Sequence, residues 1–271
     1  GSGQGAQDPM VSALEITGYS TPTFKLATAR LGTTGTRGNH SINLAARNDD
    51  FDATIAARGS QSGANWTGSI DSLQNKGRYA LVLQAPVPVK VAGPAGSGVA
   101  GLGKPEQVSV GNTVIKLPAG SITMQSLAKN GPRWTSTGQA TGVALNYLAQ
   151  FAPALKENMR GDLTLGAQWS LDMQAATATQ KETALAGMLH VFREKGDITV
   201  GVDQPLTLGL RTLDARVDVA NQQLRLAVKL DGTRAGQSDI NATVQMLGGR
   251  ISNSSALSLT GTTNIASLAW V

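Results

Sequence analysis

The chain of 271 residues contains no cysteine and has few aromatic and few charged residues. The absence of cysteine excludes disulfide bonds, thiol catalysis and thiolate metal sites. Charged residues make up 15% of the chain, below the usual share of about a quarter, which argues against a chain kept disordered by its charge. Uninterrupted apolar stretches of about 18 residues are also missing, so the sequence predicts no hydrophobic transmembrane helix.

The positive charge of the chain is widely dispersed. Lysine and arginine number 23 against 18 aspartate and glutamate residues, which gives a net charge of +5, and the sequence pI is about 9.6. The basic residues stand singly, and aromatic residues that could stack on bases make up only 4% of the chain. We therefore predict no nucleic-acid partner.

Few residues offer catalytic or ligand-binding chemistry. The only histidines, His40 and His190, are far apart in sequence, so a metal site or a Ser-His-Asp triad would require the fold to bring one of them to a carboxylate. The stretch Gly93–Lys104 contains a GxGxxG string, but Pro105 and an expected strand follow where a dinucleotide site needs a helix. We predict a loop there, and no enzyme activity, catalytic residue, metal site or cofactor.

Apolar and polar residues alternate with a period of two through most of the chain. The longest alternation runs from Leu163 to Met173, and comparable runs follow up to Met246. Turn residues such as Asn130-Gly131 separate successive runs and leave no room for repeated crossover helices. The pattern predicts an all-β fold, a long antiparallel sheet with one apolar face.

Residues 143–156 break this pattern. Leu145, Leu148 and Phe151 recur near helical spacing, and Pro153 should shorten or kink the helix that they predict. The predicted organisation is a vector-derived remnant at residues 1–10, β-rich groove segments at 11–142 and 157–271, and the short helix at 143–156.

A sheet with one apolar face and so little helix needs another way to cover that face. It can close on itself, stack on a second sheet, or curl into a trough that accepts an apolar guest. The architectural alternative is a closed, membrane-spanning sheet, whose strands also alternate over about ten residues. The four phenylalanines, four tryptophans and three tyrosines are too few for two aromatic girdles, which favours the open trough.

A succession of short motifs from Phe51 to Val271 is similar to a segment of the TamB family, which is related to the AsmA-like proteins. The motifs are Asn65–Ile70 (NWTGSI), Arg133–Gly138 (RWTSTG), Met159–Leu163 (MRGDL), Glu194–Ile198 (EKGDI), Leu208–Leu210 (LGL), Lys229–Gly232 (KLDG) and Ile265–Trp270 (IASLAW). Each motif is weak by itself, and their order carries the resemblance.

The resemblance implies a long β-sheet curled into an open groove with an apolar lining, a β-taco. It implies a periplasmic position, an inner-membrane anchor outside this sequence, and an outer-membrane partner similar to TamA. Members of the family are associated with phospholipid transport to the outer membrane and with outer-membrane protein assembly. The family has no catalytic residues to carry over.

We predict a non-enzymatic periplasmic groove that accommodates phospholipid acyl chains. The alternative is a chaperone-like module that binds β-strands of unfolded outer-membrane proteins. The sequence leaves open the cargo, the direction of transport and which strands face inward. The predicted lipid-groove lining consists of Leu163, Leu165, Trp169, Leu171, Leu206, Leu208, Leu224, Leu226, Val228 and Val244.

Overall fold

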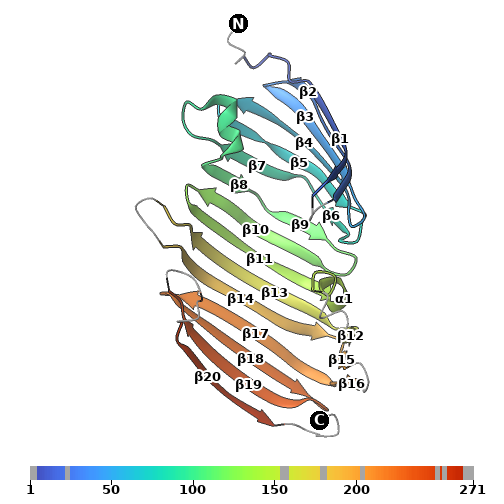
Figure 1. Ribbon diagram of the computed structural model, residues 1–271, viewed down its shortest axis with the longest axis vertical. Helices are drawn as coiled ribbons and strands as arrows, with labels where there is room; N and C mark the ends of the chain where they lie inside the picture. The colour runs from blue at the N-terminus through green and yellow to red at the C-terminus, as the bar shows by residue number, and fades with distance from the viewer. Residues whose placement is uncertain are drawn as a thin grey trace. The chain divides into compact units, whose positions relative to one another are not determined.

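The computed structural model shows a protein built almost entirely of antiparallel strands (Figure 1). It describes residues 5–21, 25–152, 159–177, 182–201, 205–247, 251 and 255–264. The helices in these ranges are a 3-10 helix, Gly98–Gly103, and one turn of α-helix, α1 (Leu145–Leu148). The predicted all-β fold with one short helix is confirmed. In the described part of the chain, neither helix has the length and apolar character needed to cross a membrane.

The chain divides into two compact units. Unit 1 comprises residues 1–118 and 123–131, and unit 2 comprises residues 119–122 and 132–271. Each unit is described by itself below.

Unit 1 is an antiparallel sheet whose first five strands follow one another in sequence order. Beyond the fifth strand the sheet divides: β5 pairs with β6 and β7, β7 pairs with β8, and β8 pairs with β10. The strands are β1 (Ser12–Ser20), β2 (Lys25–Thr36), β3 (Asn39–Arg47), β4 (Asp52–Ser62), β5 (Asn65–Asn75), β6 (Leu81–Leu83), β7 (Val87–Ala92), β8 (Gln107–Val110), β9 (Thr113–Lys116) and β10 (Ser121–Asn130).

Unit 2 contains a second series of long antiparallel strands, which lie side by side in sequence order in Figure 1. They are β11 (Arg133–Ala144), β13 (Thr164–Gln174), β14 (Ala184–Lys195), β17 (Leu210–Ala220), β18 (Gln223–Gly232), β19 (Gly236–Gln245) and β20 (Leu257–Asn264). The tight turn between β17 and β18 has Asn221 and Gln222 at φ of 50° and 59°, the conformation that such hairpins require.

A small second sheet accompanies the long strands of unit 2. Its strands are β12 (Met159–Gly161), β15 (Ile198–Val200) and β16 (Leu206–Thr207). The alternation at Leu206, Leu208 and Leu210 suggested one strand, but the structure divides it between the two sheets. Gly209, at φ +65°, turns the chain between β16 and β17, and only glycine adopts this conformation readily.

Two further sequence features differ in detail from their expected form. Leu163 precedes β13 instead of lying in it. The predicted helix at 143–156 is a single turn, because β11 continues to Ala144 and the turn following α1 ends at Phe151. The remainder, from Pro153 onward, lies outside the described residues, as does the motif at Ile265–Trp270.

Each series of strands ends at a strand with a single partner among the described residues. In the described ranges β1 pairs with β2 alone and β20 pairs with β19 alone. Every residue of both edge strands is exposed.

Candidate functional site

One face of the long sheet in unit 2 is largely apolar from β13 to β20; its polar members are Arg193, opposite Leu165, and Ser238 and Thr263. Residues directly opposite each other in neighbouring strands point to the same side of a sheet. Trp169 lies opposite Leu189, which lies opposite Val217, and this row continues through Leu226 and Ala242 to Leu259. The parallel rows on either side add these side chains: Leu165, Ala167, Leu171 and Met173; Leu185 and Val191; Leu213, Ala215 and Val219; Leu224, Val228 and Leu230; Ile240 and Val244; Leu257. We call this set of side chains the apolar face.

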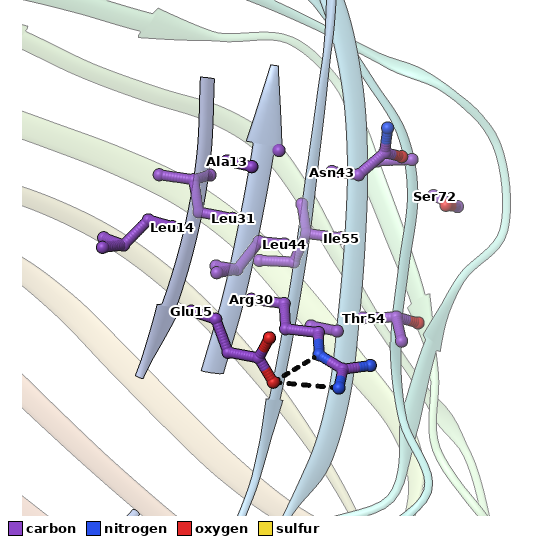
Figure 2. Close-up of a pocket in the computed structure, with 13 residues that line it drawn as sticks. Ala13, Leu14, Glu15, Arg30, Leu31, Asn43, Leu44, Thr54, Ile55 and Ser72 are labelled. Atoms are coloured by element: carbon purple, nitrogen blue, oxygen red, sulfur yellow. Dashed lines mark hydrogen bonds and ion pairs between the residues drawn. The ribbon is translucent and has the colours of Figure 1, made fainter. Parts of the chain in front are cut away.

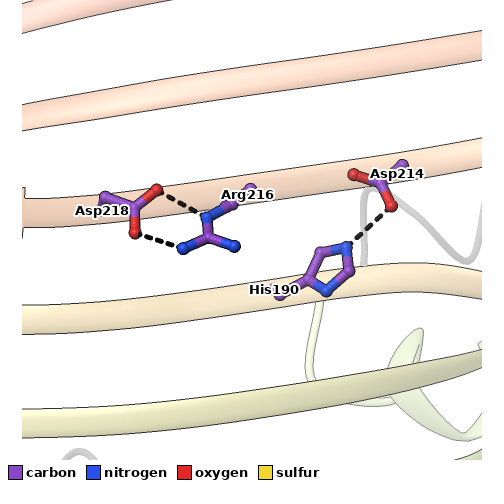
Figure 3. Close-up of polar contacts among 4 residues, drawn as sticks. All are labelled: His190, Asp214, Arg216 and Asp218. Carbon is purple, nitrogen blue, oxygen red and sulfur yellow. Dashed lines mark hydrogen bonds and ion pairs between the residues drawn. The ribbon is translucent and has the colours of Figure 1, made fainter.

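The opposite face carries polar and charged side chains that pair with one another. Arg133 forms a bidentate ion pair with Asp172 across β11 and β13. On β17, Arg216 forms an ion pair with Asp218, and the distance from Arg216 Nε to Asp218 Oδ2 is 2.7 Å (Figure 3). Hydrogen bonds from these guanidinium groups lower the pKa of both carboxyl groups. The two faces therefore differ sharply in polarity, as the alternating sequence predicts.

The structure places most of the predicted groove lining on this one face. All predicted lining residues in β13, β18 and β19 belong to the apolar face, namely Leu165, Trp169, Leu171, Leu224, Leu226, Val228 and Val244. The indole of Trp169 also donates a hydrogen bond of 3.0 Å to Ser136 Oγ, which holds the ring against β11. Whether these residues bind lipid stays a prediction.

The other predicted lining residues lie at one end of the apolar face, in or beside a buried cluster. Leu163 belongs to a buried cluster with Leu145, Ile198 and Leu210, and Leu208 packs against that cluster. The cluster also contacts Met159 and Val200 from the small sheet, and Leu165, Leu213 and Leu230 from the apolar face. We call α1, β12, β15 and β16 together the cover. Leu206 lies in the cover, opposite Val200.

The rest of the apolar face is exposed or half-buried, apart from the buried Val219, and we call it the open part. Leu171 and Leu189 are each 40% exposed, and Leu257 and Leu259 are each 65% exposed. In contrast, Leu163 is 2% exposed in the covered cluster. The large apolar side chains of the open part form a contiguous surface without a protein layer over it among the described residues.

Asp197 joins the cover to the long sheet. Its carboxylate accepts hydrogen bonds from the backbone N–H groups of Ile198, Gly209 and Leu210 at 2.8 to 3.0 Å. Its own N–H donates to Asp162 at 2.8 Å. Burial raises the pKa of the Asp197 carboxyl group, but the three donors and the nearby Arg193 outweigh burial, so this pKa lies below its ordinary value.

A family model described as the TamB N-terminal domain matches residues 12–269. The chain belongs to the TamB family. This confirms the resemblance found in the sequence motifs. No curated protein and no solved structure matches the chain.

Unit 1 of this TamB-family chain repeats the two-sided arrangement. Leu14, Leu31, Leu44 and Ile55 lie opposite one another on β1 to β4 and project from one side of the strands, as Figure 2 shows. Glu15 and Arg30 project from the other side and form an ion pair of 2.9 Å. A hollow of about 500 Å³ lies over these strands. The alternation therefore sorts polar from apolar side chains in both units.

The two histidines of the TamB-family chain occupy different environments. His40 is 2% exposed; its Nε2 accepts the indole N–H of Trp66 at 2.8 Å, and its Nδ1 lies 3.2 Å from the carbonyl of Thr36. His190 lies 2.7 Å from Asp214 on the polar face (Figure 3). The spacing of His190 and Asp214 in the sequence does not indicate that they pair, because they meet only through the register of β14 against β17.

The His190–Asp214 pair is a partly exposed surface pair. The two side chains are 24% and 40% exposed, and the histidine ring packs against Phe192. Within the described ranges, no group of three histidine, aspartate or glutamate residues is placed to hold a metal ion. The GxGxxG string at Gly96–Gly101 runs into the 3-10 helix Gly98–Gly103, and β8 follows, so the string lacks the α-helix that would hold a pyrophosphate.

Proposed function

We propose that this TamB-family chain binds phospholipid acyl chains on its apolar face and shields them from water on their way to the outer membrane. The observation that carries the proposal is the row from Trp169 to Leu259, which crosses the sheet without a charged side chain. Each methylene group moved from water onto such a surface contributes up to about 0.8 kcal/mol. A chain of many methylenes can therefore be held without a polar binding pocket.

The dimensions of the apolar face suit this ligand. Neighbouring strands lie about 4.8 Å apart, so the row through β13, β14, β17, β18, β19 and β20 is about 24 Å long. One leaflet of a bilayer has a hydrocarbon depth of about 15 Å, half of the core thickness. An extended acyl chain laid across the strands therefore finds apolar contact along its whole length, and the headgroup can remain hydrated at the margin of the sheet.

Membership of the TamB family supports the cellular setting of this proposal. The chain acts in the periplasm, held to the inner membrane by a segment outside the sequence given, and meets a TamA-like protein at the outer membrane. It is a carrier or conduit without enzymatic activity. The chemistry of the apolar face fits this role because it offers contact area and no reactive group.

Native mass spectrometry of protein expressed in cells tests lipid binding directly. We expect co-purified phospholipid in the unaltered chain and its loss in Leu226→Arg, because a charge placed among apolar side chains loses water without gaining a partner. Lys229→Glu is the matched control. Lys229 lies on the same strand but on the polar face, opposite Asp214 and Asp239. Equal loss of lipid in both variants, or no lipid in the unaltered chain, contradicts the proposal.

A second function is suggested by the edge of β20, which pairs with β19 alone among the described residues. All eight residues of this strand are exposed, and an unpaired edge can accept another strand by backbone hydrogen bonding. The guest would be a β-strand of an unfolded outer-membrane protein. A porin-derived strand peptide that binds equally well in excess phospholipid would support this function over lipid binding. Competition between peptide and lipid would instead place both on the apolar face.

A further inference from the structure

The cover is attached to the long sheet by few bonds. Its own sheet is small: β12 pairs with β15 over three residue pairs, and β15 pairs with β16 over two. Within the described ranges no strand ladder joins these strands to the long sheet. Short segments with few backbone bonds to their surroundings open at a lower free energy than the fold as a whole.

Asp197 concentrates several of these attachments on one carboxylate. It binds the N–H of Ile198 at the start of β15 and the N–H groups of Gly209 and Leu210, where β17 begins. A single side chain thus fastens the cover to the first residues of the strand beneath it. Backbone hydrogen bonds from the Leu145 N–H to the Leu163 carbonyl and from the Leu163 N–H to the Asp197 carbonyl add to this attachment, and the rest of the contact is apolar, between the buried cluster and Leu165, Leu213 and Leu230.

The apolar contact between the cover and the long sheet could be replaced by contact between the sheet and another apolar molecule. The side chains beneath the cover belong to the same face as Trp169 and Leu226, so the covered end and the open part form one surface that the cover interrupts. If the cover moves, the apolar face becomes longer along its strands.

We propose that the cover is a releasable lid, fastened by Asp197, that controls how much of the apolar face a ligand can reach. The use of the face by acyl chains rests on the function proposed above, whereas the fastening and release of the cover do not. With the cover closed, a guest meets only the open part. With the cover released, the strip at Leu165, Leu213 and Leu230 becomes accessible.

The absence of cysteine allows a direct test, because any introduced thiol is the only one in the chain. Leu210→Cys reports from beneath the cover, where Leu210 is 6% exposed, and Leu189→Cys reports from the open part, where Leu189 is 40% exposed. Each is labelled with a maleimide in the otherwise unaltered protein, in Asp197→Asn and in Asp218→Asn. Asp218 is the matched control, since its carboxylate is paired on the polar face.

We expect Leu210→Cys to react at least about tenfold more slowly than Leu189→Cys in the parent background. Asp197→Asn should raise the rate at Leu210→Cys at least about tenfold and leave Leu189→Cys unchanged, while Asp218→Asn changes neither. Unchanged slow labelling of Leu210→Cys in a folded Asp197→Asn protein overturns the proposal. Equal rates at the two positions in the parent background also overturn it.

A second measurement covers the case in which Asp197→Asn does not fold. In the parent background, low urea should accelerate labelling of Leu210→Cys with a smaller urea dependence than global unfolding, because local opening exposes less surface. A urea dependence equal to that of global unfolding would contradict a releasable lid.

A lysophospholipid below its micellar concentration separates the two proposals. Protection of Leu189→Cys by the lipid supports the proposed function, and its absence contradicts that function without affecting the labelling result for the cover. In Asp197→Asn, the lipid should also protect Leu210→Cys. Protection of Leu189→Cys alone would show that the released strip does not join the lipid-binding surface.

Discussion

The covered end and the open part of the apolar face have similar side chains but different surroundings. Leu163 and Leu210 beneath the cover are 2% and 6% exposed, whereas Leu189 and Leu259 in the open part are 40% and 65% exposed. A sheet face becomes a core only where a second layer packs on it. Exposed apolar side chains that form a contiguous surface are typical of a binding site. The covered end therefore contributes mainly to stability, and the open part is the region to which the proposed function assigns binding.

Truncation of one leucine in each region is expected to give the largest difference. Leu163→Ala removes a buried side chain and leaves a cavity, so we expect the free energy of unfolding to fall by about 2–5 kcal/mol. Leu189→Ala removes a side chain that already contacts water, and should cost less than about 1 kcal/mol. Urea denaturation followed by circular dichroism measures both. Similar losses of unfolding free energy in the two variants would show that the covered end and the open part contribute equally to stability, despite their different exposure.

The fastening of the cover should depend on pH through Asp197. Its pKa in the folded protein is below the ordinary value of 3.8, because the three N–H donors and Arg193 favour the charged carboxylate despite burial. The carboxylate therefore contributes stability that is complete above the unfolded pKa and is lost as the pH falls through the folded pKa. Hydrogen bonds to a charged group contribute about 1.5–3 kcal/mol.

The measurement compares the parent protein with Asp197→Asn from pH 6 down to pH 2.5. We expect the difference in free energy of unfolding to be largest at pH 6 and to shrink below about pH 4. Asp218→Asn, which removes an exposed ion pair, should show a much smaller difference. A difference between the parent and Asp197→Asn that stays constant over this range would mean that the charge of Asp197 does not hold the cover.

The sequence predicted the open part better than the cover, for a physical reason. Alternation with a period of two specifies the two faces of a regular strand, and Leu165 through Met173 and Leu224 through Val228 follow it. At Leu206, Leu208 and Leu210 the same spacing spans two sheets, because the chain turns at Gly209 between β16 and β17. A glycine within an alternating run, with Pro205 and Gly201 before it, was the available signal.

Long-range partners could not be predicted from the sequence. The three N–H donors of Asp197 and the ion pair of His190 with Asp214 depend on strand register and on the path of the chain. The motif EKGDI showed Asp197 only as a turn residue. Family resemblance implied an apolar groove, but it carried no information about which leucines are covered and which remain exposed.

A small change in stability is also expected from a polar substitution in the open part. Leu189→Ser replaces a side chain that is 40% exposed and lies between Trp169 and Val217 in the central row. We expect the free energy of unfolding to change by no more than about 0.5–1 kcal/mol, because little buried contact is lost. Retention of phospholipid in native mass spectrometry should nevertheless decrease, since the hydroxyl interrupts the apolar row that a chain would follow. Met188→Ser, on the same strand but opposite Asp218 on the polar face, should retain lipid as the parent does. If Leu189→Ser lost stability and kept its lipid, the open part would be part of the core and the binding surface would lie elsewhere.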